Sequence, residues 1–370
     1  MTRCRVAVIG AGIVGLAHAR AAAMRGHEVT VYERHPMAIG ASIRNFGLCL
    51  QLGQPQGELY EMAARSRAIW LETLNACGAW HKTKGSLVVA RNSQEWDMLQ
   101  AFQIEWGNAY GTRLLERSAI ERYPVRGIGG LFSQHELSLD AREAIPLVSL
   151  WLAEHHGVRF EYGTQVNAID LPDLHTSRGT RAADRVYLCT GQDLQTLYPE
   201  VMAPLNIRLC TLQMLRVSNP GIELGPAVLT GLSALHYASF RQSPSLLPKL
   251  ERLRRHVEGH EPHLLEHGIH LIVQQVGHSG ELIIGDSHHY GIGVSPFADS
   301  RVDDAILQLA EALLGMDLRV VQRWQGVYPS GPRPYETISL APGVSATMVT
   351  SGIGMSVAFA LAERMLDNDR

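Results

Sequence analysis

Apolar residues near the start of the chain form two short runs on either side of a helical stretch. Residues 4–10 and 28–33 read as strands, and the alanine-rich residues 13–25 between them read as a helix. Strands joined by one helix in this way are typical of neighbouring, buried parallel strands. A later apolar run over residues 184–190 ends in a glycine turn, and Ser345–Thr350 reads as a last strand followed by a helix to about Met365. The pattern therefore predicts a nucleotide-binding fold at both ends of the chain, with a β-rich insertion between its parts.

The middle of the chain shows mixed periodicity. Helices are expected over residues 57–77, 94–105, 141–155, 244–258 and 303–314, and strands over residues 84–90, 158–162, 165–169 and 209–217. Residues 269–276 and 281–284 predict a hairpin closed by a Gly-His-Ser-Gly turn. The segment after residue 105 reads as loop-rich up to about Asp140.

Glycines with a fixed spacing follow the first strand. Gly10 permits a tight turn, Gly12 lets the backbone approach a pyrophosphate, and Gly15 allows the helix to pack closely on the sheet. The N-terminus of that helix, with Ile13 and Val14, offers free N–H groups and the positive end of its dipole to phosphates. Glu33 ends the second strand, where its carboxylate can accept hydrogen bonds from an adenosine ribose. Together these features predict a dinucleotide site.

Composition narrows the class of protein. The chain has 370 residues, a formal net charge of −3 and 46% hydrophobic residues, which is ordinary for a globular enzyme of two domains and indicates neither a nucleic-acid partner nor a membrane partner. Five scattered cysteines without a CxxC pair predict reduced thiols and a cytoplasmic location. The apolar start resembles an export signal, but the glycine fingerprint occupies the same residues, so we expect no export.

Five ordered motifs resemble the D-amino-acid oxidase family of FAD-dependent oxidoreductases, which includes glycine and sarcosine oxidases. They are the glycine fingerprint with Glu33, residues 40–47, the strand end at residues 188–191, Trp324-Gln-Gly326, and residues 351–355 at the last helix. The resemblance implies an α/β fold: a Rossmann-like, discontinuous FAD-binding domain of the GR2 type with an inserted α+β substrate domain built on an antiparallel sheet. The expected FAD-binding domain comprises residues 1–80, 141–208 and 320–370, and the expected cap comprises residues 81–140 and 209–319.

The resemblance also implies which residues hold FAD. Arg44 is expected near the reactive flavin nitrogen, with Ser42 and Asn45 on the same side of the ring. The N–H groups at the start of the last helix are expected to face the flavin pyrimidine edge, where negative charge develops on reduction. The remaining cofactor residues are expected at Arg34, Val166, Thr190, Gly191, Gly352, Ile353, Gly354 and Met355. Some family members attach flavin through a cysteine after the Trp-x-Gly motif. Residues 328–340 contain none here, which implies non-covalent FAD.

The implied reaction is oxidation of a small primary or secondary amine. Hydride passes from the carbon beside the nitrogen to flavin, the imine hydrolyses to an aldehyde or keto acid, and O2 is reduced to H2O2. Residues 42–47, 53–55, 212–216 and 235–240 further resemble a subgroup associated with aminophosphonate breakdown. An acidic group on the substrate favours an arginine partner. The candidates for the substrate site are Arg44, Arg216, Arg241, Arg333, His236 and Tyr237.

Alternatives remain at this point. A flavin dehydrogenase with another electron acceptor, or a non-catalytic flavin subunit of a larger complex, would share these motifs, and the oligomeric state is open. Histidines crowd residues 256–270, but the string His-Val-Glu-Gly-His is not HExxH, and Gly259 and Pro262 interrupt the helix, so we expect a polar loop and no metal. Neither GxSxG nor a P-loop motif occurs in the sequence.

Overall fold

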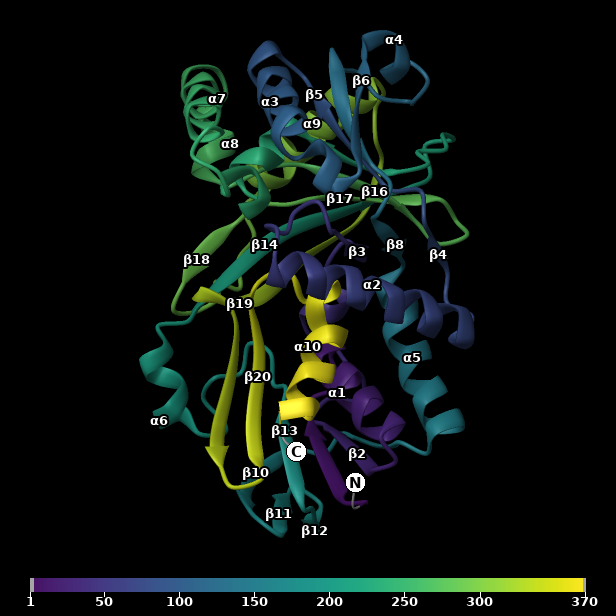
Figure 1. Ribbon diagram of the computed structural model, residues 1–370, viewed down its shortest axis with the longest axis vertical. Helices are drawn as coiled ribbons and strands as arrows, with labels where there is room; N and C mark the ends of the chain where they lie inside the picture. The colour runs from purple at the N-terminus through teal and green to yellow at the C-terminus, as the bar shows by residue number, and fades with distance from the viewer. Residues whose placement is uncertain (1–2, 369–370) are drawn as a thin grey trace.

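A computed structural model describes residues 3–368 (Figure 1). One 14-stranded mixed sheet runs through the molecule, and its parallel part has the order β20-β13-β1-β2-β9. These strands are β1 (Arg5–Ile9), β2 (Glu28–Glu33), β9 (Arg159–Tyr162), β13 (Arg185–Leu188) and β20 (Val344–Ser351). They come from distant parts of the sequence, as the glycine fingerprint and the last apolar strand predict.

The side chains of β1 are apolar on both faces of the parallel sheet, so both faces must be covered by other elements. Val6 and Val8 pack into the core formed with the helices, whereas Ala7 and Ile9 pack on the opposite face. The helices are α1 (Ile13–Met24), α2 (Glu58–Cys77), α5 (Ala141–His156) and α10 (Gly354–Asn368). A small antiparallel sheet covers the other face, made of β10 (Val166–Asp170), β11 (Asp173–Thr176) and β12 (Gly179–Ala182).

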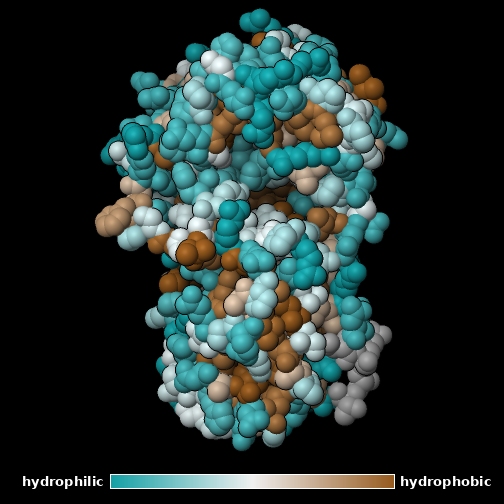
Figure 2. Space-filling model, turned by 90° about the vertical axis from the view of Figure 1, so that its left-hand side faces the viewer, coloured by the Kyte–Doolittle hydropathy of each residue, from teal (hydrophilic) through white to brown (hydrophobic). Residues whose placement is uncertain are grey.

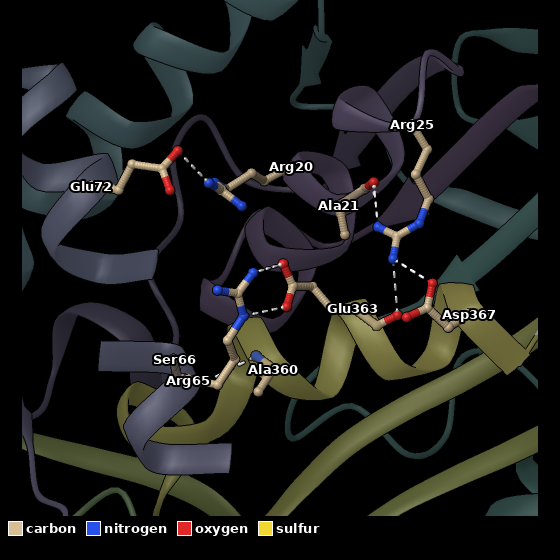
Figure 3. A network of polar contacts seen from close by, with 9 residues as sticks. All are labelled: Arg20, Ala21, Arg25, Arg65, Ser66, Glu72, Ala360, Glu363 and Asp367. Atoms are coloured by element: carbon tan, nitrogen blue, oxygen red, sulfur yellow. Dashed lines mark hydrogen bonds and ion pairs between the residues drawn. The ribbon is translucent and has the colours of Figure 1, made fainter. Parts of the chain in front are cut away.

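Polar contacts fix the C-terminal helix α10 against α1 and α2 (Figure 3). Arg25 pairs with Asp367 at 2.7 Å, and Arg65 makes two contacts of 2.8 Å with Glu363. The first pair joins the end of α1 to the end of α10, and the second joins α2 to α10. Helix α10 is therefore held against both helices, and the starts of α1 and α10 both line the cavity described below.

The antiparallel part of the main sheet forms the other half of the molecule, at the top of Figure 1. Its strands are β5 (Ser86–Ala90), β6 (Thr112–Glu116), β7 (Gly129–Ser133), β14 (Arg208–Val217), β15 (Ala227–Thr230), β16 (Ile272–Val276), β17 (Glu281–Gly285), β18 (His289–Gly291) and β19 (Val320–Ala341). Only the pair β5–β15 within this part is parallel. Its helices are α3 (Ser93–Tyr110), α4 (Arg117–Ile120), α7 (Leu247–His260), α8 (Pro262–Glu266) and α9 (Ser300–Leu314). The predicted hairpin is β16–β17, which pairs antiparallel.

The long strand β19 joins the two halves. Residues Val320 to Ser330 pair with β14, and residues from Ser330 to Ala341 pair with β20. The register shifts between Ser330 and Tyr335, where Pro332 and Pro334 lie, because proline cannot donate a ladder hydrogen bond. The predicted fold class is confirmed, since an antiparallel sheet continues a parallel nucleotide-binding sheet. The domain bounds themselves stay a prediction.

Short elements complete the connections. They are β3 (Leu48–Cys49), β4 (His81–Lys82), β8 (Leu137–Leu139) and α6 (Pro199–Met202), with 3-10 turns η1 (Ala41–Ile43), η2 (Ala203–Leu205), η3 (Gly231–Leu235) and η4 (Ala238–Arg241). Strands β3, β8 and β4 form a third sheet between the halves. Among the described helices, none is both long and apolar enough to cross a membrane.

Several sequence predictions differ from the structure. The histidine-rich stretch expected to be a polar loop forms the end of α7 and the short helix α8. The segment expected to be loop-rich contains the end of α3 and the elements β6, α4, β7 and β8. Strand β7 begins with Gly129 and Gly130, which have low strand propensity. A Cβ at Gly130 would lie 2.8 Å from the Val88 carbonyl oxygen, so close packing selects glycine in this strand. Helix α7 begins at Leu247, three residues after the expected start at Pro244.

Candidate functional site

One cavity extends from the carboxyl ends of β1 and β2 across the middle of the molecule into the antiparallel half. Figure 2 shows brown, hydrophobic residues gathered around the waist of the molecule, where the surface is hollowed. All but one of the predicted cofactor residues line this cavity: Gly10, Gly12, Ile13, Val14, Glu33, Arg34, Ser42, Arg44, Asn45, Val166, Thr190, Gly191, Gly352, Ile353, Gly354 and Met355. The exception is Gly15, which lies beneath the glycine turn.

The glycine turn is built by close backbone contacts. Gly10 has φ +106°, and a Cβ there would lie 2.5 Å from the carbonyl oxygen of Cys189. Gly15 lies directly under the carbonyl oxygen of Gly10, where no Cβ fits. The turn therefore requires glycine at both positions, and it brings the start of α1 to the cavity wall.

Glu33 stands at the end of β2 with a fixed carboxylate. One oxygen accepts a hydrogen bond from the N–H of Ala11 at 3.0 Å, and the other accepts from the N–H of His35 at 2.9 Å. Each oxygen keeps a further lone pair for a ligand. This geometry suits ribose hydroxyls, because the acceptors are held in place before the ligand binds.

The start of α1 has a cap supplied by another segment. Gly12 has no side chain to cap the helix, and Ser42 Oγ instead accepts from the N–H of Ile13 at 2.8 Å. The Ser42 hydroxyl keeps its own proton to donate to a ligand. The start of α1 therefore fits a pyrophosphate. It offers the positive end of the helix dipole, the exposed backbone of Gly12 and the hydroxyl of Ser42.

The loop that carries Arg44 is fixed by the Trp-Gln-Gly motif on β19. Trp324 Nε1 donates to the carbonyl oxygen of Arg44 at 3.2 Å, and a Cβ at Gly326 would lie 2.9 Å from the same oxygen. The guanidinium of Arg44 donates to the carbonyl of Gln325 at 3.4 Å, a long contact. Its side chain forms no ion pair with any carboxylate in the described part of the chain. Arg44 therefore offers a positive charge to the middle of the cavity.

The start of α10 faces the same region. Gly352 has φ +74°, and a Cβ there would lie 3.1 Å from the Tyr328 ring. Gly354 and Met355 begin the helix, so their N–H groups are among the first of α10, which have no partner within the helix. This helix start can stabilise negative charge on a ring held between it and Arg44.

A polar cluster closes the far end of the cavity in the antiparallel half. It comprises His236 and Tyr237 from the η3–η4 connection, His270 before β16, and Asp286 and His288 after β17. The His236 ring lies 4.1 Å from the His270 ring and 4.3 Å from the His288 ring, measured between centroids. Burial lowers the pKa of His236 and His270 well below the ordinary histidine value, and burial raises the pKa of Asp286 and of Tyr237.

Sequence reasoning found only part of this cluster. His236 and Tyr237 were expected, but His270, Asp286 and His288 were not. His270 is separated in space from the other histidines of its stretch, because it precedes buried strand β16 while His256 and His260 lie on helix α7. The available signal was the pairing of the two hairpin strands, which brings the residue before β16 close to the residues after β17.

Three candidate substrate arginines lie outside the cavity wall. Arg216 contacts Glu281 at 2.7 Å and lies 4.0 Å from Asp140. Arg333 pairs with Glu336, and Arg241 donates to the carbonyl of His236 at 3.3 Å. The structure does not bring any of the three to the cavity, because carboxylates or backbone groups hold them elsewhere.

Arg34 and Thr190 lie at the adenosine end. Arg34 pairs with Asp193 at 2.6 Å, and Thr190 Oγ1 donates to the carbonyl of Asp193 at 2.8 Å. Gly191 and Val166 line the wall beside them. These residues form the part of the cavity wall that was predicted to hold adenosine.

Solved structures with this fold cover nearly the whole chain. Glycine oxidase from Bacillus cereus ATCC 14579 is 18% identical, with a TM-score of 0.78 over 99% of this chain and 95% of that chain. L-proline dehydrogenase from P. horikoshii is 19% identical, with a TM-score of 0.76 over 100% and 94%. At these identities the likeness shows the fold.

A curated relative matches a shorter segment. The bifunctional protein MnmC of tRNA 5-methylaminomethyl-2-thiouridine biosynthesis, from Pseudomonas putida (strain W619), is 33% identical over 107 residues. The match spans 29% of this chain and 14% of the relative. The family model DAO, described as FAD dependent oxidoreductase, matches residues 5–367. The chain therefore belongs to the DAO family of FAD-dependent oxidoreductases.

Proposed function

We propose that this enzyme oxidises a small primary or secondary amine that carries an anionic group, with O2 as the final electron acceptor. The observation that carries the proposal is that one cavity joins the dinucleotide fingerprint to a buried polar cluster. The first end carries the residues expected to hold FAD, and the second end is lined by the polar side chains of the cluster around His236. The similar structures are named for glycine and for L-proline, a primary and a secondary amine.

Non-covalent FAD fits the residues present. Glu33 would hold the ribose, the start of α1 with Ser42 would hold the pyrophosphate, and Arg44 with the start of α10 would flank the ring. When bound, FAD supplies the acceptor that takes a hydride from the carbon next to the substrate nitrogen. The product imine then hydrolyses to an aldehyde or keto acid.

The protein itself contributes in two ways: it desolvates the substrate amine, and it places the positive charge of Arg44 in the cavity. The substrate end is lined by the buried His270 and the partly buried Tyr237, so an ammonium ion loses solvation on entering and the neutral amine is favoured. A neutral nitrogen keeps the lone pair that assists hydride loss. The positive charge of Arg44 stabilises electron density that arrives beside it.

The proposed substrate class is narrowed to N-substituted aminoalkylphosphonates by the resemblance of residues 42–47, 53–55, 212–216 and 235–240 to the aminophosphonate subgroup. Gly53 and Pro55 line the same cavity as His236 and Tyr237. A Cβ at Gly53 would lie 2.8 Å from the Tyr237 ring, so these separated segments pack against one another at the substrate end. A phosphonate differs from a carboxylate in size and charge. Comparing amines that carry one or the other group can therefore show which substrate class the enzyme prefers.

A panel of amines tests the proposal. The purified flavoprotein is mixed anaerobically with glycine, sarcosine, L-proline, 2-aminoethylphosphonate and its N-methyl derivative, and the flavin absorbance is followed. We expect bleaching by the N-methyl aminophosphonate and, in air, one H2O2 per amine oxidised. Bleaching by glycine or L-proline and not by the phosphonates would transfer the assignment to amino acids.

The same experiment separates the alternatives. Fast bleaching followed by slow reoxidation in air, together with rapid dye reduction, would identify a dehydrogenase. Bleaching by no amine in the panel would contradict the proposal and favour a flavin subunit that needs a partner chain. The variant Arg44→Gln should retain FAD and bleach at least tenfold more slowly, because the charge beside the ring is lost.

A further inference from the structure

We propose that His236, His270, His288 and Asp286 bind one divalent transition-metal ion of the zinc class at the substrate end of the cavity. One ring nitrogen from each of the three histidines can be chosen so that all three lie within 4.8 Å of one another. The carboxylate of Asp286 lies 3.4 Å from His270 Nε2 and 3.8 Å from His288 Nε2. Three imidazoles and a carboxylate are a ligand set that suits zinc.

Hydrogen bonds fix the tautomer of His288. Its Nδ1 lies 2.9 Å from the carbonyl oxygen of Gly268, and a carbonyl only accepts, so Nδ1 carries the proton. In the neutral ring, Nε2 is then a bare lone pair, and it lies 3.8 Å from Asp286 Oδ2. Metal-binding histidines are held in this way, with the second ring nitrogen donating to a carbonyl.

His270 has the same arrangement. The Ser233 hydroxyl donates to the carbonyl oxygen of His270 at 3.0 Å and lies 3.2 Å from its Nδ1. When the single hydroxyl proton is donated to the carbonyl, Nδ1 donates to Ser233 Oγ and Nε2 keeps a free lone pair. This Nε2 lies 3.4 Å from Asp286 Oδ1.

The two lone pairs therefore face a buried carboxylate. Asp286 is 5% exposed, and its Oδ1 receives no hydrogen bond from the described residues. Lone pairs directed at a buried carboxylate repel it unless a cation lies between them. Tetrahedral ligands at about 2.0–2.1 Å from zinc are roughly 3.3 Å apart. The separations of 3.4 and 3.8 Å are close to that value.

A metal ion would also supply a charge that the cavity lacks at this end. Arg216, Arg241 and Arg333 lie outside the cavity, and Asp286 adds a negative charge beside the substrate site. With three histidines and one carboxylate as ligands, the ion carries a net positive charge and can accept an oxyanion by expanding its coordination. Binding of the substrate's phosphonate or carboxylate there rests on the proposed function, whereas the metal site does not.

Cobalt titration of tag-free protein tests the site directly. Protein is stripped with a chelator, and Co2+ is added while its visible d–d absorption is recorded. We expect saturation near one equivalent per chain and displacement by one equivalent of Zn2+. Asp286→Asn and His288→Gln should each weaken binding at least tenfold, whereas His278→Gln, on the exposed hairpin turn, should leave it unchanged.

The controls and the readouts of this experiment do not depend on oxidation of an amine. Flavin absorbance and circular dichroism show whether each variant is folded. If the stripped protein shows no saturable Co2+ signal, or if the folded Asp286 and His288 variants bind as the parent does, the cluster holds protons or the ion binds elsewhere, and the proposal is wrong. If methylphosphonate does not change the Co2+ spectrum, the oxyanion role alone is overturned. Failure of every amine to bleach the flavin would contradict the proposed function and leave the metal result standing.

Discussion

Gly15 of helix α1 lies so close to the carbonyl oxygen of Gly10 that no side chain fits between them. Gly15→Ala should therefore push the glycine turn away from α1, at a cost of about 1–3 kcal/mol in unfolding free energy. Because the turn forms the wall of the dinucleotide site, we expect FAD affinity to fall at least tenfold. Fluorescence titration of the apoprotein with FAD and urea unfolding measure the two effects.

Gly259 is the matched control for that substitution. It lies in helix α7 with ordinary helical geometry, and a Cβ there meets no atom within 4 Å. Gly259→Ala should stabilise the protein by up to about 1 kcal/mol, because alanine favours helix, and should leave FAD affinity unchanged. Equal FAD affinity in the two variants would show that the Gly10–Gly15 contact does not shape the cofactor site.

Ser42 caps helix α1 from another segment, through its contact with the N–H of Ile13 at 2.8 Å. Ser42→Ala should remove about 1 kcal/mol of stability from the apoprotein, as loss of a helix cap does. It should also weaken FAD binding about fivefold, because the hydroxyl no longer orients the pyrophosphate. Calorimetric titration with FAD measures the loss. Ser93→Ala, at an exposed position on α3, should change neither value, and a similar effect of both variants would contradict a specific role for Ser42.

Arg216 is held by Glu281 outside the cavity, and its side chain is 14% exposed. Arg216→Met should lower the unfolding free energy by about 1–3 kcal/mol, because Glu281 loses its partner. The KM for the amine should not change. Steady-state kinetics together with urea unfolding separate the two effects. The double variant Arg216→Met with Glu281→Leu should recover most of the stability. A tenfold rise in KM for Arg216→Met alone would show instead that Arg216 binds the substrate.

The fate of the arginine candidates shows what the sequence can and cannot predict. The glycine fingerprint and Glu33 were located because their function depends on local backbone geometry at a fixed spacing. Arg216 and Arg333 do not line the cavity, because an arginine can meet a carboxylate of its own protein as readily as one on a substrate. That outcome depends on Glu281, which the register between β14 and β17 brings beside Arg216, and on Glu336, which lies three residues after Arg333 on the same strand β19.

Pairing between strands that are distant in the sequence also explains why the sequence does not predict strand β19 or the full polar cluster. Strand β19 was not expected because Pro329, Pro332 and Pro334 interrupt its pattern, yet pairing with β14 and β20 stabilises it. The cluster of His270, Asp286 and His288 depends on the same kind of information, because it forms where the β16–β17 hairpin meets the η3–η4 connection. Local sequence identifies each of these histidines only as a polar residue beside an apolar run.

Burial lowers the pKa of Lys82 to about 8, with Lys84 acting in the same direction and Glu223 opposing it. In the unfolded chain this pKa is near 10.4, so the unfolded state binds more protons between pH 8 and 10.4. The folded state is therefore destabilised by Lys82 at pH 7, and its stability rises as the pH increases through that window. Lys82→Met should raise the unfolding free energy at pH 7 by on the order of 1–2 kcal/mol, and this gain should shrink towards pH 10.

Urea unfolding of the apoprotein at pH 7, 8.5 and 10 measures this window. Other groups titrate over the same range, so the quantity to compare is the difference between the parent and Lys82→Met at each pH. Lys249→Met is the control for loss of a lysine, because Lys249 lies 3.7 Å from Asp97 near the surface. A constant difference between the parent and Lys82→Met from pH 7 to pH 10 would show that the amine is charged and solvated in the folded protein, since a lysine with an ordinary pKa contributes no such pH dependence.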